Sequence, residues 1–245
     1  MSRINSLINK IIRPLGIVIK RANELEGRNT MYDAIERSKS FHHVNPVTVI
    51  DVGAAKGIWT SMAIKVWPGS NYVLFEPLKE REEILSDIRN KNKNIYIVNK
   101  AAGDSNIEID FFIATDLDGS GVAGDISASN LRKVKQTTLD AEISGLQLKG
   151  PFVIKLDTHG YEVPIIDGAE KILKDTQLLI IECYGFKIAP FSLLFWEMCA
   201  YLKSKGFRLI DIVDIDLRKK DGAFWQCDAF FIPDTSPCFS SNSYL

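Results

Sequence analysis

The chain has 245 residues, of which 46% are hydrophobic and 25% charged, and its 30 basic and 31 acidic side chains leave a formal charge of −1. This composition is typical of an ordinary globular chain and excludes collagen, coiled-coil and disordered classes. A balanced charge also disfavours broad polyanion binding, which needs a basic surface. We therefore expect no nucleic acid partner.

The four cysteines stand far apart, form no C-x-x-C pair and have no histidine at metal-ligand spacing beside them. This pattern predicts neither a zinc site nor a disulfide framework, and it favours a reducing compartment. No stretch reaches the roughly 20 apolar residues that span a bilayer. The N-terminus lacks the cleavage site of a secretory signal. We expect a cytoplasmic protein.

The N-terminal segment, residues 1–23, carries five basic side chains and no acidic one, with apolar residues at helical spacing. Two interpretations stay open: a solvated helix packed on the body, or a contact with an anionic membrane surface or a partner protein. A second helix is predicted at 31–41. His42 and His43 are expected to end it before Pro46, because the residue before a proline avoids helical geometry. Together these elements form an N-terminal helical extension, residues 1–46.

From residue 47 onward, short apolar runs alternate with amphipathic stretches, as in a mostly parallel sheet covered by helices on both faces. The expected parallel strands are 47–53, 71–77, 94–101, 151–157 and 177–184. The expected helices are 57–67, 79–91, 162–174 and 190–205. An Asp-Gly hairpin signal joins two further runs into an antiparallel pair, 207–215 and 224–233. The sequence predicts an α/β domain with a seven-stranded sheet over residues 47–233.

Two segments stand apart from this alternation. An inserted hairpin is predicted at 107–114, followed by a long loop rich in Gly, Ser and Asp at 115–130. Long loops inside compact domains are often functional. Residues 234–245 have little apolar content and predict a flexible tail.

The first predicted strand runs through Asp51, Gly53, Ala54 and Gly57 directly into a helix. Glycines at a strand-to-helix turn let the backbone approach a ligand and point helix N–H groups at it. The dinucleotide pattern G-x-G-x-x-G is not matched, because Ala55 stands where a glycine is required. Asp51 also suits a ligand that carries positive charge better than a pyrophosphate.

The ends of the next two strands strengthen this site. Glu76 follows Gly53 by 23 residues, at a strand end where an acid accepts both hydroxyls of a ribose. Asn99 and Ala101 end the third strand, where an adenine would rest against small side chains; an ordinary strand-to-turn junction is the alternative. The predicted cofactor-binding residues are Asp51, Gly53, Ala54, Gly57, Glu76, Asn99, Ala101 and Asp157.

The most specific motif is IKLDTHGYEVPIIDGA at 154–169. With DVGAAKG, LFEP and a preceding Thr-Leu-Asp at 138–140, it resembles the FkbM family of S-adenosylmethionine-dependent methyltransferases, over about residues 31–233. The family pattern is K-I-D-x-x-G-x-E followed by G-A, and the matching residues here are Lys155, Asp157, Gly160, Glu162, Gly168 and Ala169. Thr158 and His159 replace a pair that is commonly Val-Glu or Thr-Gln in the family.

The resemblance implies a class I methyltransferase (Rossmann-like) sheet, a bound S-adenosylmethionine and O-methylation of a sugar, glycan or polyketide-like small molecule. Most of the rate in such a displacement comes from positioning. Asp157 and His159 are the predicted catalytic residues, because they follow the fourth strand at the edge where open sheets bind ligands, and an imidazole takes a proton near neutral pH. A solvent-facing or capping role for His159 stays open. No metal site is predicted, although Mg²⁺ on Asp157 stays an alternative.

Neighbouring residues have secondary predictions. Glu162 is expected to be a helix N-terminal acid that packs the motif loop. Lys155 lies near the site or in a structural ion pair, and Glu182 and Tyr184 are expected to face the acceptor. Two rival functions stay open: an NAD-dependent oxidoreductase, disfavoured by the missing G-x-G, and a non-catalytic nucleotide-binding scaffold in polysaccharide biosynthesis, disfavoured by the intact turn and Glu76.

Overall fold

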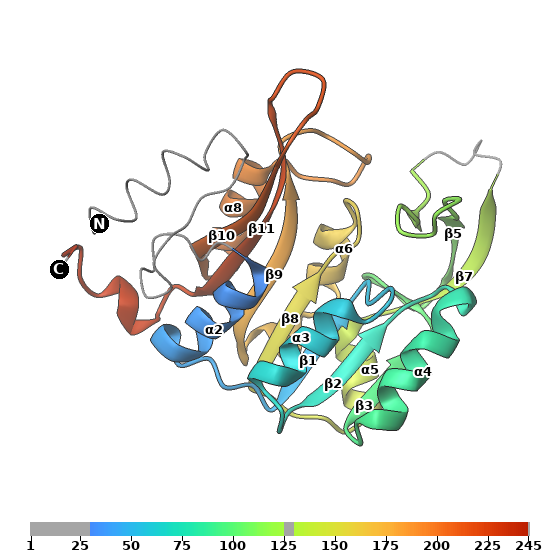
Figure 1. Ribbon diagram of the computed structural model, residues 1–245, viewed down its shortest axis with the longest axis horizontal. Helices are drawn as coiled ribbons and strands as arrows, with labels where there is room; N and C mark the ends of the chain where they lie inside the picture. The colour runs from blue at the N-terminus through green and yellow to red at the C-terminus, as the bar shows by residue number, and fades with distance from the viewer. Residues whose placement is uncertain (1–29, 125–129, 245) are drawn as a thin grey trace, which may run out of the picture.

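The computed structural model describes residues 30–124 and 130–244. The predicted basic segment at 1–23 lies outside the described residues. Seven strands form the main sheet in the order β10-β11-β9-β8-β1-β2-β3, and four short strands form a second sheet in the order β4-β7-β5-β6 (Figure 1). None of the helices in the described ranges has the length and apolar character needed to cross a membrane.

The elements have the following bounds. The main sheet contains β1 (Thr48–Val52), β2 (Asn71–Phe75), β3 (Ile95–Val98), β8 (Phe152–Leu156), β9 (Thr176–Tyr184), β10 (Phe207–Leu217) and β11 (Phe224–Pro233). The second sheet contains β4 (Ala101–Ala102), β5 (Glu108–Phe112), β6 (Gly121–Val122) and β7 (Leu131–Thr137). The helices are α2 (Met31–His42), α3 (Ile58–Val66), α4 (Glu82–Lys91), α5 (Leu139–Gly145), α6 (Glu162–Asp167), α7 (Glu170–Leu173) and α8 (Phe195–Ser204), with short 3-10 turns η2 (Lys79–Arg81) and η3 (Pro237–Phe239).

The main sheet confirms the predicted topology. β1 pairs in parallel with β2 and β8, and the parallel pairing continues to β3 on one side and β9 on the other. β11 is antiparallel to β9 and to β10, as the hairpin signal predicts. The chain order therefore reverses between β1 and β8, and a crevice at the carboxyl ends of these strands is the usual ligand site of such sheets.

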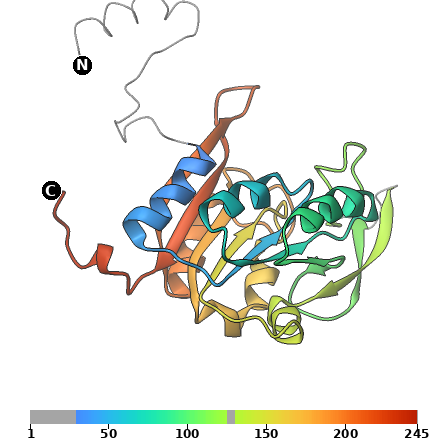
Figure 2. The same ribbon diagram turned by 60° about the horizontal axis from the view of Figure 1, so that its bottom comes forward.

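Helices cover both faces of the sheet (Figures 1 and 2). Successive strand residues point to opposite faces, so Val49 packs in the core cluster that contains α2, α3 and α4, while Ile50 packs in the cluster with α5 to α8. Both side chains are fully buried. Complete burial of one such side chain contributes about 1.5–3 kcal/mol, so the two layers together hold the strand ends in place.

The prediction of a single helix at 162–174 was wrong, because the chain forms two helices there, α6 and α7. A Cβ atom at Gly168 would lie 2.0 Å from the backbone oxygen of Gly103. The Gly168 oxygen also accepts a hydrogen bond from Asp140 N at 3.2 Å. This close backbone contact ends α6. The predicted helix 190–205 begins later, at α8, where Glu197 Oε2 accepts the Leu194 N–H at 2.8 Å.

The insertion is more ordered than predicted. β5 pairs antiparallel with both β6 and β7, so the segment 107–114 belongs to a sheet and the loop 115–130 contains a strand. The sequence analysis missed β7 and α5. In β7 the side chains of Arg132, Lys133 and Lys135 are exposed, so the segment reads as polar although it pairs on both sides.

The two ends of the domain follow the predictions in part. His43 ends α2 in the left-handed conformation, with φ 54°, which confirms the capping interpretation of this residue. Phe239, in the predicted tail, packs on β10: the guanidinium carbon of Arg208 lies 3.9 Å from the centre of its ring. The predicted domain boundaries and the flexibility of residues 234–245 stay predictions.

Candidate active site

A cavity of about 440 Å³ opens at the carboxyl ends of β1, β2 and β8, where the chain order reverses. This volume lies within the usual range of small-molecule sites. Six of the predicted site residues line it: Gly53, Ala54, Glu76, Ala101, Asp157 and His159. Residues from four strand ends and two loops thus meet at one place, as the strand-end reasoning predicts.

Glu76 is held at the end of β2 by the turn that follows β1. Its Oε2 accepts the backbone N–H of Ala55 at 2.9 Å, and its Oε1 accepts that of Leu78 at 2.9 Å. Burial raises the pKa of Glu76, and these two N–H groups act in the opposite direction. Each carboxylate oxygen keeps a further lone pair, so the side chain can accept two more hydrogen bonds from a ligand.

Gly53 is required by the close approach of β1 and β8. Its φ is +80°, and a Cβ atom there would lie 2.1 Å from the backbone oxygen of Asp157. No side chain fits at this distance. Gly53 therefore brings the first turn and the Asp157 loop together on one wall of the cavity.

Three predicted cofactor residues do not line the cavity. Asp51 is fully buried and its Oδ2 accepts the Thr60 hydroxyl at 2.5 Å, so it joins β1 to α3. A Cβ atom at Gly57 would lie 2.3 Å from Cδ1 of Ile88, so this glycine allows the close packing of the turn on α4. Asn99 is exposed, because the chain leaves β3 at Val98 and turns toward the second sheet.

Asp157, which is partly exposed, forms an ion pair with the buried Lys155, two residues earlier on β8. The Lys155 Nζ lies 2.6 Å from Asp157 Oδ2. Burial alone would lower the pKa of Lys155, but the charges of Asp157 and Asp51 hold that pKa above its usual value. Burial raises the pKa of Asp157, yet the Lys155 ammonium outweighs it and keeps that pKa low. Both partners are therefore charged at neutral pH.

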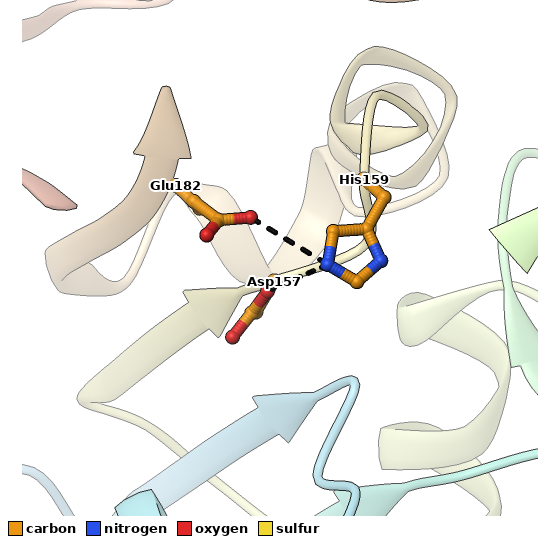
Figure 3. A group of neighbouring side chains, drawn as sticks. All are labelled: Asp157, His159 and Glu182. Carbon is orange, nitrogen blue, oxygen red and sulfur yellow. Dashed lines mark ion pairs between the residues drawn. The ribbon is translucent and has the colours of Figure 1, made fainter. Parts of the chain in front are cut away.

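His159 lies between two carboxylates (Figure 3). Its Nε2 is 3.8 Å from Asp157 Oδ1 and 3.8 Å from Glu182 Oε2. Its Nδ1 lies 3.4 Å from the backbone oxygen of Ser120, which favours the tautomer with the proton on Nδ1. Nε2 then carries no proton, and the charged Asp157 carboxylate beside it would stabilise a positive charge on the ring.

The loop that carries His159 is strained and held by Glu162. His159 has a positive φ of 54°, a conformation that costs a non-glycine residue about 1–3 kcal/mol. Glu162 Oε1 accepts the N–H groups of Thr158 at 3.3 Å and Gly160 at 3.1 Å, and the Thr158 hydroxyl at 3.0 Å. This confirms the predicted role of Glu162, which positions the imidazole without lining the cavity.

Further acids surround the imidazole. Glu182 accepts hydrogen bonds from the Tyr184 hydroxyl and, at 2.7 Å, from Gln226 Nε2. Burial and the charge of Asp157 raise the pKa of Glu182 to about 8. Burial likewise raises the pKa of Asp228, which lines the same cavity, to about 6. The sequence analysis missed Asp228, although an acidic residue inside the apolar run of β11 indicates a candidate site residue.

Asp157, His159 and Glu182 each offer one donor atom, and these atoms lie within 4.8 Å of one another. The spacing is compatible with a divalent cation, which the sequence did not predict. However, the Lys155 ammonium already supplies a positive charge at Asp157. A second cation beside it would be repelled, so the arrangement suits proton transfer better than metal binding.

A loop of the insertion covers one side of the cavity. Asp118 lines the cavity and forms ion pairs with Lys56, at 2.9 Å, and with Arg81. Lys56 belongs to the turn after β1, and Arg81 to η2. The hydrogen bond from Lys56 lowers the pKa of Asp118, so the carboxylate stays charged. These ion pairs hold the loop against the turn that follows β1, at the edge of the cavity.

Comparison with known proteins agrees with this geometry. The chain matches the Methyltransferase FkbM domain over residues 51–209. It is similar to a methyltransferase FkbM from Methylobacillus flagellatus KT, with a TM-score of 0.51 and 17% identity over 75% of this chain, and it spans only 43% of that protein. It is also similar to Aeropyrum pernix fibrillarin with natively bound S-adenosyl-L-methionine, with a TM-score of 0.50 and 10% identity over 82% of this chain and 73% of the other.

No curated protein matches the sequence. Structural likeness at these identities establishes the fold, while the domain match covers more than half of the chain. The match begins at Asp51, on β1, and includes the whole Asp157 loop. The chain belongs to the FkbM methyltransferase family.

Proposed function

We propose that this protein transfers the methyl group of S-adenosylmethionine to a hydroxyl oxygen of a sugar, glycan or polyketide-like small molecule. The observation that carries the proposal is the position of His159: its Nε2 lies between two carboxylates on the wall of the cavity that also contains Glu76 and the Gly53 turn. This arrangement supports a proton acceptor at His159 beside a nucleoside site that contains Glu76.

The cavity fits S-adenosylmethionine by its chemistry. Glu76 offers a carboxylate with free lone pairs for the ribose hydroxyls, and Phe75, Leu78 and Ala101 offer an apolar surface for the adenine. Asp157, paired with Lys155, lies on the same wall of the cavity. When bound, the cofactor supplies a methyl group on a positively charged sulfur.

His159 then acts as the base. Nε2 takes the acceptor's hydroxyl proton while the oxygen forms its bond to the methyl carbon. The carbon–sulfur bond breaks and its electron pair stays on the sulfur, which leaves neutral S-adenosylhomocysteine. The charged Asp157 carboxylate stabilises the imidazolium that forms. General base catalysis of this kind contributes about 10²–10⁴-fold, and the rest of the rate comes from positioning.

The test combines cofactor binding with turnover. Calorimetry should detect S-adenosylmethionine binding, and mass spectrometry should detect transfer of a labelled methyl group to members of a sugar and glycan panel. His159→Gln should lose about 100-fold in turnover with unchanged cofactor affinity, and EDTA should have no effect. A folded protein that binds no cofactor would refute the proposal. Binding without transfer to any acceptor would favour the scaffold function.

We also propose a cytoplasmic reaction in polysaccharide biosynthesis, with no nucleic acid partner. The dispersed cysteines, all four of them free, support the compartment. The formal charge of −1 argues against a polyanionic partner. Fractionation of cells that produce the tagged full chain would test the compartment, and recovery outside the cytoplasm would contradict it.

A further inference from the structure

A second cavity, of about 630 Å³, lies beside the first and shares Gly121, Val122 and His159 with it. We propose that this cavity, the acceptor groove, binds a neutral sugar ring and presents one ring hydroxyl to His159. The methylation of the bound sugar rests on the proposed function, whereas the binding of a neutral sugar to the groove does not depend on it. None of the residues that hold the first turn or Glu76 lines it.

One wall of the acceptor groove is aromatic and fixed. Trp225 meets Tyr184 edge-on, with ring centres 6.2 Å apart, and lies tilted by 30° against Phe186 at 5.6 Å. Arg218 covers Phe186, with its guanidinium carbon 4.0 Å from the ring centre. A pyranose ring has a face of C–H groups that packs on such a surface. Because the rings hold one another, little conformational entropy is lost when a ligand binds.

Another part of the lining presents the peptide backbone. β6 is the edge strand of the second sheet, paired with β5 on one side, and Gly121, Ala123 and Gly124 expose little side chain there. A Cβ atom at Gly121 would lie 4.0 Å from the His159 Cβ, so this strand runs directly past the imidazole. Peptide groups at a sheet edge can hydrogen-bond the hydroxyl rim of a sugar.

The described lining of the acceptor groove contains no Lys, Arg, Asp or Glu. A phosphate or carboxylate held there would lose water without gaining a counter-charge, which is strongly unfavourable. Gln226 adds a neutral amide, whose Nε2 donates to Glu182 Oε1 at 2.7 Å and whose oxygen stays available. An aromatic wall, a peptide wall and a neutral amide favour an uncharged polyol over an anion or a wholly apolar ring.

Saturation-transfer NMR on the full chain with saturating S-adenosylhomocysteine tests this without any turnover. The probes are methyl glycosides of glucose, mannose, galactose and rhamnose, with glucose 6-phosphate, glucuronate and the macrolactone erythronolide B for comparison. At least one neutral glycoside should bind, and the charged sugars should bind at least 10-fold more weakly. Trp225→Ala should weaken glycoside binding at least 10-fold, and Trp196→Ala should leave it unchanged, because Trp196 lies outside both cavities.

Ala123→Trp provides a second route, because it fills the groove from the peptide wall and leaves the aromatic wall intact. It should abolish glycoside binding while S-adenosylmethionine affinity stays within two-fold. Glycoside binding that survives both variants, a preference for the charged sugars or the macrolactone, or absence of glycoside binding would overturn the proposal. Failure of the protein to bind S-adenosylmethionine, with glycoside binding intact, would instead refute the proposed function and leave the groove assigned.

Discussion

Glu76→Ala separates the structural and ligand-binding roles of one carboxylate. In the structure two backbone N–H groups donate to it, each at 2.9 Å. An unsatisfied buried donor costs about 1–3 kcal/mol. Because both groups lose their acceptor, we expect the variant to lose about 2 kcal/mol of unfolding free energy and to stay folded at 20 °C.

The same variant should bind S-adenosylmethionine more weakly, because both ribose hydroxyls lose a charged acceptor. Hydrogen bonds to charged groups contribute about 1.5–3 kcal/mol, which corresponds to a rise of about 10- to 150-fold in Kd. Calorimetry measures Kd, and urea unfolding measures stability. Glu80→Ala is the matched control, because Glu80 pairs with Arg132 outside the cavity and should leave Kd unchanged. A folded Glu76→Ala protein with wild-type Kd would refute the assignment.

Three further changes test other parts of the site. Gly57→Ala should lower stability by about 1–3 kcal/mol, since φ is +67° and Ile88 lies in the way, with cofactor Kd unchanged in calorimetry. Asp118→Asn should speed cofactor dissociation in stopped-flow about 2- to 5-fold by loosening the loop over the cavity, and an unchanged rate would show that the loop does not retain the ligand. Burial raises the pKa of Glu182 from 4.5 to about 8, so the folded chain keeps a proton that the unfolded chain releases, and stability from this group falls as pH rises between about 5 and 8. The Tm of Glu182→Gln should therefore decline less than that of the wild type from pH 6 to 8.5, and parallel declines would contradict the shift.

The main sheet was predictable because each strand carries its own signal. Strands buried on both faces read as continuous apolar runs, and their carboxyl ends meet wherever the connections are right-handed. This is why Gly53, Glu76 and Asp157 meet as expected. The second sheet was harder to predict, because Arg132, Lys133 and Lys135 give β7 a polar sequence although it pairs with β4 and β5.

Gly57, Asn99 and Asp51 were predicted to line the cavity but do not, because the sequence near each strand end does not encode the direction of its side chain. Gly57 belongs to the turn by sequence, but the direction of its missing side chain depends on where α4 packs, which no local pattern encodes. Asn99 ends a strand whose chain turns to another sheet, so proximity in sequence to Ala101 does not bring it to the cavity. Asp51 is drawn inside by its hydrogen bond to Thr60. Strand-end reasoning identifies the edge of the sheet and leaves side-chain direction open.

The two halves of the site differ in how they arise from the sequence. The half that contains Glu76 comes from neighbouring strand ends of the main sheet, whereas the acceptor groove joins the β6 edge to Tyr184 and Trp225 from strands far along the chain. His159 stands between the halves and belongs to both cavities. We expect changes in the β10–β11 hairpin to alter which hydroxyl reaches the imidazole more than they alter cofactor binding, because Trp225 and Gln226 line only the acceptor groove. The insertion contributes Gly121 and Val122 to both cavities and Asp118 to the first, so we expect changes there to affect acceptor and cofactor together.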